Sequence, residues 1–187
     1  MIGVLINPNN PVAASDTSEI EAAARSLGQL IRIIHVGTEQ EFDAAFAALG
    51  AQRVGALLIL PDALFTNGRD RLVTLAARYH LPAIYWTSLV PEAGGLVSYG
   101  TDVKEAFRQV GVYTGRILKG EKPSDLPVVQ SVKFELAINL KTAKALGLSV
   151  PTSLLATGSR VLTACVSSQR TFSPTAAMIT TKRAVCI

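Results

Sequence analysis

The polar residues best placed for chemistry in this chain follow an apolar run that ends abruptly. Residues 55–60 read Gly-Ala-Leu-Leu-Ile-Leu, and Pro61 and Asp62 come directly after them, with Thr66 and Asn67 close behind. A continuous apolar run of this length is typical of a strand that is buried on both faces of a parallel sheet. In open α/β sheets, ligands bind at the carboxyl ends of such strands, so Asp62, Thr66 and Asn67 are expected to meet a polar ligand.

The overall composition is that of a globular protein. Of the 187 residues, 49% are hydrophobic and 17% are charged, which provides enough apolar material for one full-sized domain or two small lobes. No stretch of the sequence approaches the ~20 consecutive apolar residues of a membrane helix. Met1 leads directly into an apolar segment without a basic leader or a cleavage site, so the chain as written is expected to stay in the cytoplasm.

The sequence favours neither a metal site nor nucleic-acid binding. The two cysteines, Cys165 and Cys186, lie far from the two histidines, His35 and His80, so no disulfide framework, zinc site or cofactor is expected. Residues 1–156 hold 14 basic residues and all 14 acidic ones, so the formal net charge of +4 comes from the end of the chain. The four basic residues there are scattered without a recognisable motif, which argues against nucleic-acid binding.

Strands and helices are expected to alternate along most of the chain. Apolar or β-branched segments predict strands at residues 2–6, 30–36, 55–60, 83–86 and 134–139. Apolar residues at helical spacing predict helices that begin near residue 15 and at residues 39, 68, 103 and 140, each ending before a glycine or a proline. Such alternation indicates βαβ units and an α/β fold with a doubly wound parallel sheet.

The end of the chain differs in character from the rest. From about Leu155 onwards the helical and strand periodicities are lost, and no acidic residue follows. The sequence therefore predicts three segments, namely an α/β lobe at 1–86, a hinge crossing with closing helices and a strand at 87–156, and a poorly ordered basic tail at 157–187. A frameshift or read-through would produce a tail of this kind.

Six blocks of the sequence, taken in order, resemble one known family. The blocks occupy residues 2–8, 55–62, 81–85, 92–100, 116–127 and 134–147. In them the chain resembles the substrate-binding proteins of bacterial ABC uptake systems, in particular the receptors for tryptophan and tyrosine transport. The resemblance covers residues 2 to about 155 and does not extend into the tail.

This resemblance implies the fold of a type I periplasmic binding protein, in which two doubly wound α/β lobes joined by hinge crossings close on a ligand. It also implies a small-molecule ligand such as an amino acid, an ABC permease as partner, a periplasmic location, and no catalysis. The chain begins at what resembles the first strand of the second lobe, so the first lobe is expected to be largely missing. Because apolar surface that normally faces that lobe would be exposed, a homodimer or larger assembly is expected.

The resemblance assigns a carboxylate-binding role to the first loop of the chain. The loop from Asn7 to Asn10 and the helix start near Ser15 correspond to the place where family members offer hydroxyls and backbone N–H groups to a ligand carboxylate. A helix N-terminus suits this role because it carries free donors and a partial positive charge.

The resemblance places the ligand amine on the other side of the expected cleft. Asp62, Thr66 and Asn67 correspond to the edge that faces a ligand amine or polar group, and Trp86 and Glu92 border the same cleft. An aromatic ring over a cation, with a carboxylate beside it, would suit an amino acid.

Each of these candidates also has a purely structural interpretation. Asn7 and Asn10 stand beside prolines and are turn formers. Asp62 and Asn67 would be suitable caps for the helix that is expected to begin near Gly68. Trp86 could pack in the core instead of against a ligand. Glu92 could be solvated, and Asp102 could be a helix N-cap.

Two other functions stay open on the sequence alone. An α/β enzyme is one of them, because the same sheet edges host catalysis on many folds. The phosphate-loop, Gly-x-Gly-x-x-Gly and Gly-x-Ser-x-Gly motifs are nevertheless missing, and no His-Cys or His-Asp pair has a useful spacing. The other is the ligand-sensing domain of a regulator, which can share the type I fold.

Overall fold

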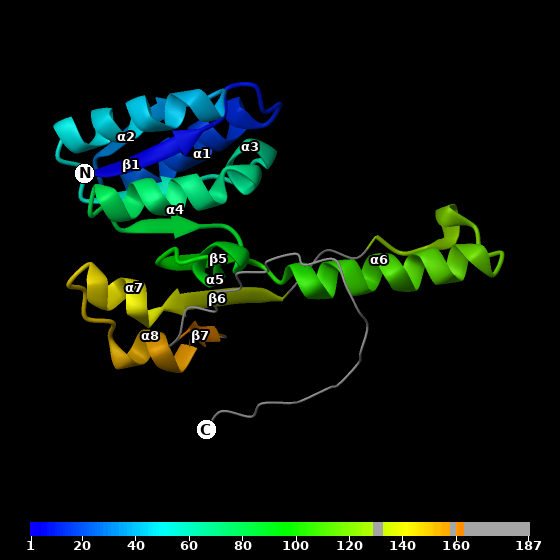
Figure 1. Cartoon of the computed structure of the whole chain (residues 1–187). Coiled ribbons are helices and arrows are strands. Elements are labelled where there is room, and N and C mark those ends of the chain that lie inside the picture. Colours follow the sequence, from blue (N-terminus) through cyan, green and yellow to red (C-terminus); the bar gives the residue numbers. More distant parts are fainter. Residues whose placement is uncertain (129–132, 158–159, 163–187) are drawn as a thin grey trace, which may run out of the picture.

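One mixed sheet runs through the described part of the chain. The computed structural model describes residues 1–128, 133–157 and 160–162. The strands lie across the sheet in the order β2-β1-β3-β4-β5-β6-β7 (Figure 1). Their bounds are β1 Ile2–Ile6, β2 Ile31–His35, β3 Ala56–Ile59, β4 Ala83–Tyr85, β5 Val97–Thr101, β6 Phe134–Asn139 and β7 Arg160–Leu162.

Strands β1 to β5 all run parallel to one another. Strand β6 runs antiparallel to β5, and β7 is parallel to β6. The order 2-1-3-4-5 with a helix between successive strands is that of a doubly wound α/β sheet, so the predicted fold class is confirmed. Because β1 to β5 are parallel, their carboxyl ends meet at one edge of the sheet.

Helices cover both faces of the sheet. Their bounds are α1 Ala13–Ser26, α2 Phe42–Ala51, α3 Ala63–Asn67, α4 Arg69–Arg78, α5 Leu89–Glu92, α6 Val103–Leu118, α7 Leu140–Ala145 and α8 Thr152–Thr157, with short 3-10 turns at Glu39–Glu41 and Pro123–Asp125. The connections β1-α1-β2 and β2-α2-β3 run in opposite directions across the sheet. Right-handed crossovers therefore place α1 and α2 on opposite faces.

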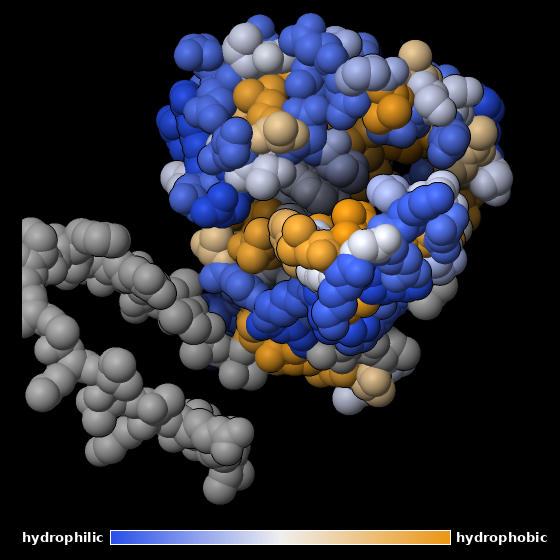
Figure 2. Space-filling view, turned by 90° about the vertical axis from the view of Figure 1, so that its right-hand side faces the viewer, coloured by the Kyte–Doolittle hydropathy of each residue, from blue (hydrophilic) through white to orange (hydrophobic). Residues whose placement is uncertain are grey.

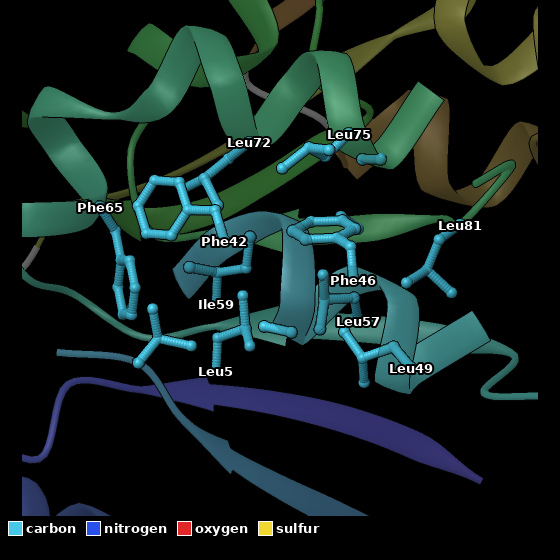
Figure 3. Close-up of a cluster of buried hydrophobic side chains, with 14 of the residues drawn as sticks. Leu5, Phe42, Phe46, Leu49, Leu57, Ile59, Phe65, Leu72, Leu75 and Leu81 are labelled. Atoms are coloured by element: carbon cyan, nitrogen blue, oxygen red, sulfur yellow. The ribbon is translucent and has the colours of Figure 1, made fainter. Parts of the chain in front are cut away.

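The main hydrophobic core lies between the sheet and the helices α2 and α4 (Figure 3). Phe42 and Phe46 of α2 are fully buried there, as is Leu72 of α4. Leu5 of β1 and Leu57 of β3 point into the same core from the sheet. This packing fixes β1 and β3 side by side, and it therefore fixes the loops that follow their carboxyl ends.

Tyr85 of β4 carries a buried hydroxyl group without a hydrogen-bond partner among the described residues. The side chain is 1% exposed, and burial raises the pKa of its phenol above the ordinary value. An unpaired polar atom in the core costs roughly 1–3 kcal/mol. We therefore expect Tyr85→Phe to stabilise the protein by about 1 kcal/mol in thermal unfolding. The same change at half-buried Tyr79 should have almost no effect, and a destabilised Tyr85→Phe variant would contradict this expectation.

Helix α6 projects away from the rest of the molecule (Figure 1). The sequence predicted an amphipathic helix with an inward apolar face, and the helix is present at the expected residues. Its predicted inward residues are nevertheless exposed, namely Val103, Phe107, Val110, Ile117 and Leu118, with exposed fractions of 36% to 82%. The prediction of their burial is therefore wrong for this structure, because α6 projects away from the sheet and these side chains stay exposed in the described part of the chain.

Strand β7 lies inside the range that the sequence analysis assigned to the tail. Arg160, Val161 and Leu162 pair with β6 in register, so at least these three residues belong to the sheet. That part of the prediction is corrected, since the pairing of a three-residue strand leaves no periodicity to read. Residues 163–187, with Cys165 and Cys186, lie outside the described residues.

Candidate functional site

Three of the candidate residues meet at the carboxyl edge of the sheet. Asn7 and Asn10 lie in the loop between β1 and α1, and Asp62 lies just after β3, which is the neighbour of β1. Asn7 Nδ2 donates a hydrogen bond of 3.0 Å to Asp62 Oδ1, and Asn10 Nδ2 donates one of 2.8 Å to Asp62 Oδ2. The structure therefore brings these three residues together in one cluster.

Asp62 is also the N-cap of α3. Its backbone is extended, and its Oδ1 accepts a hydrogen bond of 2.8 Å from Leu64 N. Thr66 Oγ1 donates to the Asp62 carbonyl at 2.8 Å, so this hydroxyl is engaged within the helix. Asn67 is the exposed last residue of α3, and α4 has no side-chain cap at its start. Asp62 is therefore a helix cap, but of the short helix α3. The helix that was predicted to begin near Gly68 is α4, and neither Asp62 nor Asn67 caps it.

Helix α1 begins at Ala13, two residues before the predicted start near Ser15. The backbone N–H of Ala13 donates to the Asn10 carbonyl, and that of Asp16 donates to the Val12 carbonyl. In the part of the chain that the structure describes, the N–H groups of Ala14 and Ser15 have no such partner. Unpaired N–H groups at the start of a 14-residue helix favour the binding of an anion.

Trp86 and Glu92 do not join the Asp62 cluster. The Trp86 side chain is half-buried and packs against the main core, as its structural interpretation proposed. Glu92 ends α5, and its carboxylate forms an ion pair with the guanidinium of Arg160 on β7. Arg160 Nε also lies 3.4 Å from Glu135 Oε1 of β6. The Glu92 carboxylate is therefore paired within the fold and is not solvated freely.

The chain leaves and re-enters the sheet at adjacent positions beside this edge. Asp102 N donates to the Lys133 carbonyl at 3.0 Å, and Lys133 Nζ lies 3.0 Å from Asp102 Oδ2. The hydrogen bond from Lys133 holds the pKa of the Asp102 carboxyl below its ordinary value, and Asp102 also caps α6 by accepting from Lys104 N and Glu105 N. The N-cap interpretation of Asp102 is therefore confirmed.

Two exposed aromatic rings lie at the same crossing and were not among the predicted candidates. Tyr99 of β5 and Phe134 of β6 stack with their ring centroids 5.7 Å apart and their planes 15° apart. Both side chains are more than half exposed. Figure 2 views the molecule from the side towards which α6 projects, and hydrophobic residues gather in the middle of that side. Exposed apolar side chains therefore lie at the crossing that Asp102 and Lys133 form.

A small apolar cavity of about 190 Å³ lies elsewhere, between α4, α7 and the turn that precedes β5. Leu81, Gly95 and Leu146 are among the residues that line it, and none of the Asp62 cluster does. In the described residues, no helix is long and apolar enough to cross a membrane, and no group of His, Cys, Asp or Glu side chains is arranged to hold a metal ion. The Asp62 edge therefore carries the polar groups best suited to a ligand.

Comparison with known proteins gives the family. The family described as ABC transporter substrate binding protein matches residues 1–162. The chain belongs to this family. The match ends at the last residue of β7. Substrate-binding proteins are not enzymes, and members of this family bind solutes in the periplasm or outside the cell.

Solved protein structures share the fold of this family member. The ABC domain from Streptococcus pneumonia in complex with L-Trp is 25% identical, with a TM-score of 0.76 over 86% of this chain and 56% of that one. A conserved domain protein from Vibrio cholerae is 23% identical, with a TM-score of 0.74 and coverages of 86% and 54%. The open, ligand-free form of a Clostridium difficile substrate-binding protein with adhesive properties is 23% identical. Its TM-score is 0.62, over 87% of this chain and 54% of that one. No curated protein matches this chain.

The chain thus spans little more than half the length of these solved structures. The resemblance that the sequence blocks indicated is confirmed, both by the family and by the α/β fold of the neighbours.

Proposed function

We propose that this substrate-binding family member forms one wall of a ligand site that serves an ABC import system, and that it binds an amino acid at the carboxyl edge of its sheet. The observation that carries the proposal is that the N–H groups of Ala14 and Ser15, which have no hydrogen-bond partner among the described residues, directly follow the loop that Asn10 ties to Asp62. The start of α1 would receive the ligand carboxylate, because its donors and its helix dipole both favour an anion.

One structural neighbour supports an amino acid as the ligand class. The Streptococcus pneumonia protein is in complex with L-Trp, and 86% of the present chain matches the fold of that protein. The exposed Tyr99 and Phe134 rings would provide apolar contact for the flat side chain of such a ligand. L-tryptophan is therefore the first ligand to test, with other amino acids after it.

Closure on the ligand would use the paired crossing at Asp102 and Lys133. Two chain segments pass side by side there, which is the arrangement of a hinge. A ligand that contacts both walls would bind the closed arrangement more tightly and would increase its population. An ABC permease as partner and a location outside the cytoplasmic membrane follow from the family, and we extend both to this chain as part of the proposal.

We propose in addition that a second copy of the chain covers the apolar face of α6. Phe107 is 72% exposed and Leu118 is 82% exposed, and a face of this kind on a free helix favours association. Light scattering should therefore detect a homodimer or a larger assembly. Phe107→Glu should reduce the measured mass of this assembly, whereas Lys104→Glu, at an exposed polar position of the same helix, should leave the mass unchanged. A monomer at high concentration would contradict this part of the proposal.

Titration of the folded protein with L-tryptophan tests the ligand site. A ligand at 100 times its dissociation constant should stabilise the protein by ~2.7 kcal/mol, which a thermal-shift assay detects. Ala14→Pro removes one free N–H group while proline is tolerated in the first turn of a helix, so this variant should bind the amino acid more weakly. Ala14→Gly keeps the N–H group and should retain binding.

The two variants separate the outcomes. Equal loss of binding in Ala14→Pro and Ala14→Gly would contradict a role for the N–H group at the start of α1. The absence of any stabilisation by the amino acid panel, in a sample that unfolds cooperatively, would contradict the proposed ligand class.

A further inference from the structure

We infer that Asp62 is a positioning residue of the ligand site, and that it does not serve as the counter-charge of a ligand amine. Its carboxylate fastens the loop between β1 and α1 to the loop between β3 and α3, and it thereby fixes the start of α1. The inference rests on the proposed function for its effect on ligand binding, while its effect on the loop can be measured without any ligand.

The hydrogen bonds of the carboxylate carry the inference. Asp62 Oδ1 accepts from Asn7 Nδ2 at 3.0 Å and from Leu64 N at 2.8 Å, and Asp62 Oδ2 accepts from Asn10 Nδ2 at 2.8 Å. A carboxylate has about four acceptor positions, so three of them are already occupied by groups of the protein. A ligand ammonium would have to share or displace these donors.

The two asparagines pass this constraint on to the backbone of the loop. Asn7 Oδ1 accepts from Asn9 N at 3.0 Å, and Asn10 Oδ1 accepts from Val12 N at 3.1 Å. Each amide side chain is therefore held at both ends, by the Asp62 carboxylate on one side and by its own loop on the other. This loop is therefore ordered by two hydrogen bonds whose partners lie 52 and 55 positions apart in the sequence.

The loop in turn sets the position of the helix start. The Asn10 carbonyl accepts from Ala13 N at 3.0 Å, and Ala13 is the first residue of α1. The free N–H groups of Ala14 and Ser15 follow directly. The Asp62 carboxylate thus acts on the ligand through Asn10 and the helix start, and a positional error there would weaken the binding of a ligand carboxylate.

Two probes separate a positioning role from direct contact with a ligand amine. L-tryptophan carries both a carboxylate and an ammonium group, whereas indole-3-propionic acid has the same ring and carboxylate without the ammonium. In the full chain, we expect Asp62→Asn to weaken the binding of both probes by the same factor, about tenfold, because one hydrogen bond is lost. A loss confined to L-tryptophan would overturn the inference.

Reversal of the hydrogen bond provides a rescue. In Asp62→Asn, the new amide faces the Asn10 amide, so donor meets donor, while asparagine remains a good N-cap for α3. Adding Asn10→Asp restores a donor and an acceptor with reversed polarity, and the double variant should recover most of the affinity for both probes. A double variant that stays as weak as Asp62→Asn would count against the inference.

Hydrogen exchange of the loop amides gives the readout that needs no ligand. The N–H groups of Asn9 and Val12 should exchange about tenfold faster in Asp62→Asn than in the wild type, and the double variant should restore their protection. Asp43→Asn, which removes a surface ion pair with Arg71, is the matched control and should leave both amides unchanged. Unchanged exchange in Asp62→Asn would overturn the inference. If the wild type binds neither probe, the proposed ligand class is rejected. The exchange of the Asn9 and Val12 amides then still decides whether Asp62 positions the loop.

Discussion

Replacement of Gly100 by alanine is expected to destabilise the protein by about 3 kcal/mol or more. Gly100 lies in β5, and a Cβ atom at this position would lie 1.8 Å from the Trp86 carbonyl oxygen and 2.8 Å from the Trp86 carbonyl carbon. Both atoms belong to the backbone next to β4, so no side chain can rotate away. Two strands would have to separate, which thermal or urea unfolding will detect as a large loss of stability.

The same substitution at Gly111 is the matched control. Gly111 lies inside α6, and a Cβ atom there would meet nothing within 4 Å. Alanine is favoured over glycine in a helix interior by roughly 1 kcal/mol, so Gly111→Ala should be neutral or stabilising. Two variants with equal losses would show that the contact between Gly100 and Trp86 does not limit the approach of these strands.

Asn139→Ala is expected to cost about 2–4 kcal/mol of stability, from a lost helix cap and a lost buried hydrogen bond together. Asn139 is 2% exposed at the junction of β6 and α7. Its Nδ2 donates to the Pro91 carbonyl at 2.9 Å, and its Oδ1 accepts from Thr142 N at 3.1 Å. One side chain thus links α5 to the start of α7, and unfolding in denaturant will measure what it contributes.

Asn139→Ser divides this loss into its two parts. Serine is a good N-cap but is too short to reach the Pro91 carbonyl, so this variant should recover about 1 kcal/mol relative to alanine. Equal stabilities of the serine and alanine variants would indicate that the cap contributes nothing here.

The sequence was informative where apolar runs alone determine a strand. The predicted strands at 2–6, 30–36 and 83–86 correspond to β1, β2 and β4. Strand β5 was not predicted, because Ser98 and Gly100 interrupt its apolar pattern and its conformation depends on close contact with β4 and pairing with β6. A contact of this kind is a property of the tertiary structure, and no local pattern reports it.

The candidate site was predictable in its location and not in its connections. Parallel neighbours β1 and β3 must bring their carboxyl ends together, so the proximity of Asn7, Asn10 and Asp62 follows from the topology. The sequence did not show that their side chains bind one another, because hydrogen bonds over more than 50 positions depend on side-chain geometry. The ion pair of Glu92 with Arg160 spans 68 positions and was missed for the same reason.

The exposed face of α6 illustrates a further limit of sequence patterns. Helical spacing of apolar residues predicts that one face will be buried, and it does not identify the partner that covers it. In this structure, the predicted buried face is present on the correct helix and no described element covers it.

Backbone amide NMR spectra recorded during a titration with L-tryptophan will show whether the carboxyl edge of the sheet binds the ligand. We expect the largest shifts at Ala14 and Ser15, at the start of α1, and smaller ones near Thr66. Shifts gathered instead around Leu81 and Leu146, at the apolar cavity between α4 and α7, would contradict this expectation, as would spectra that do not change at all.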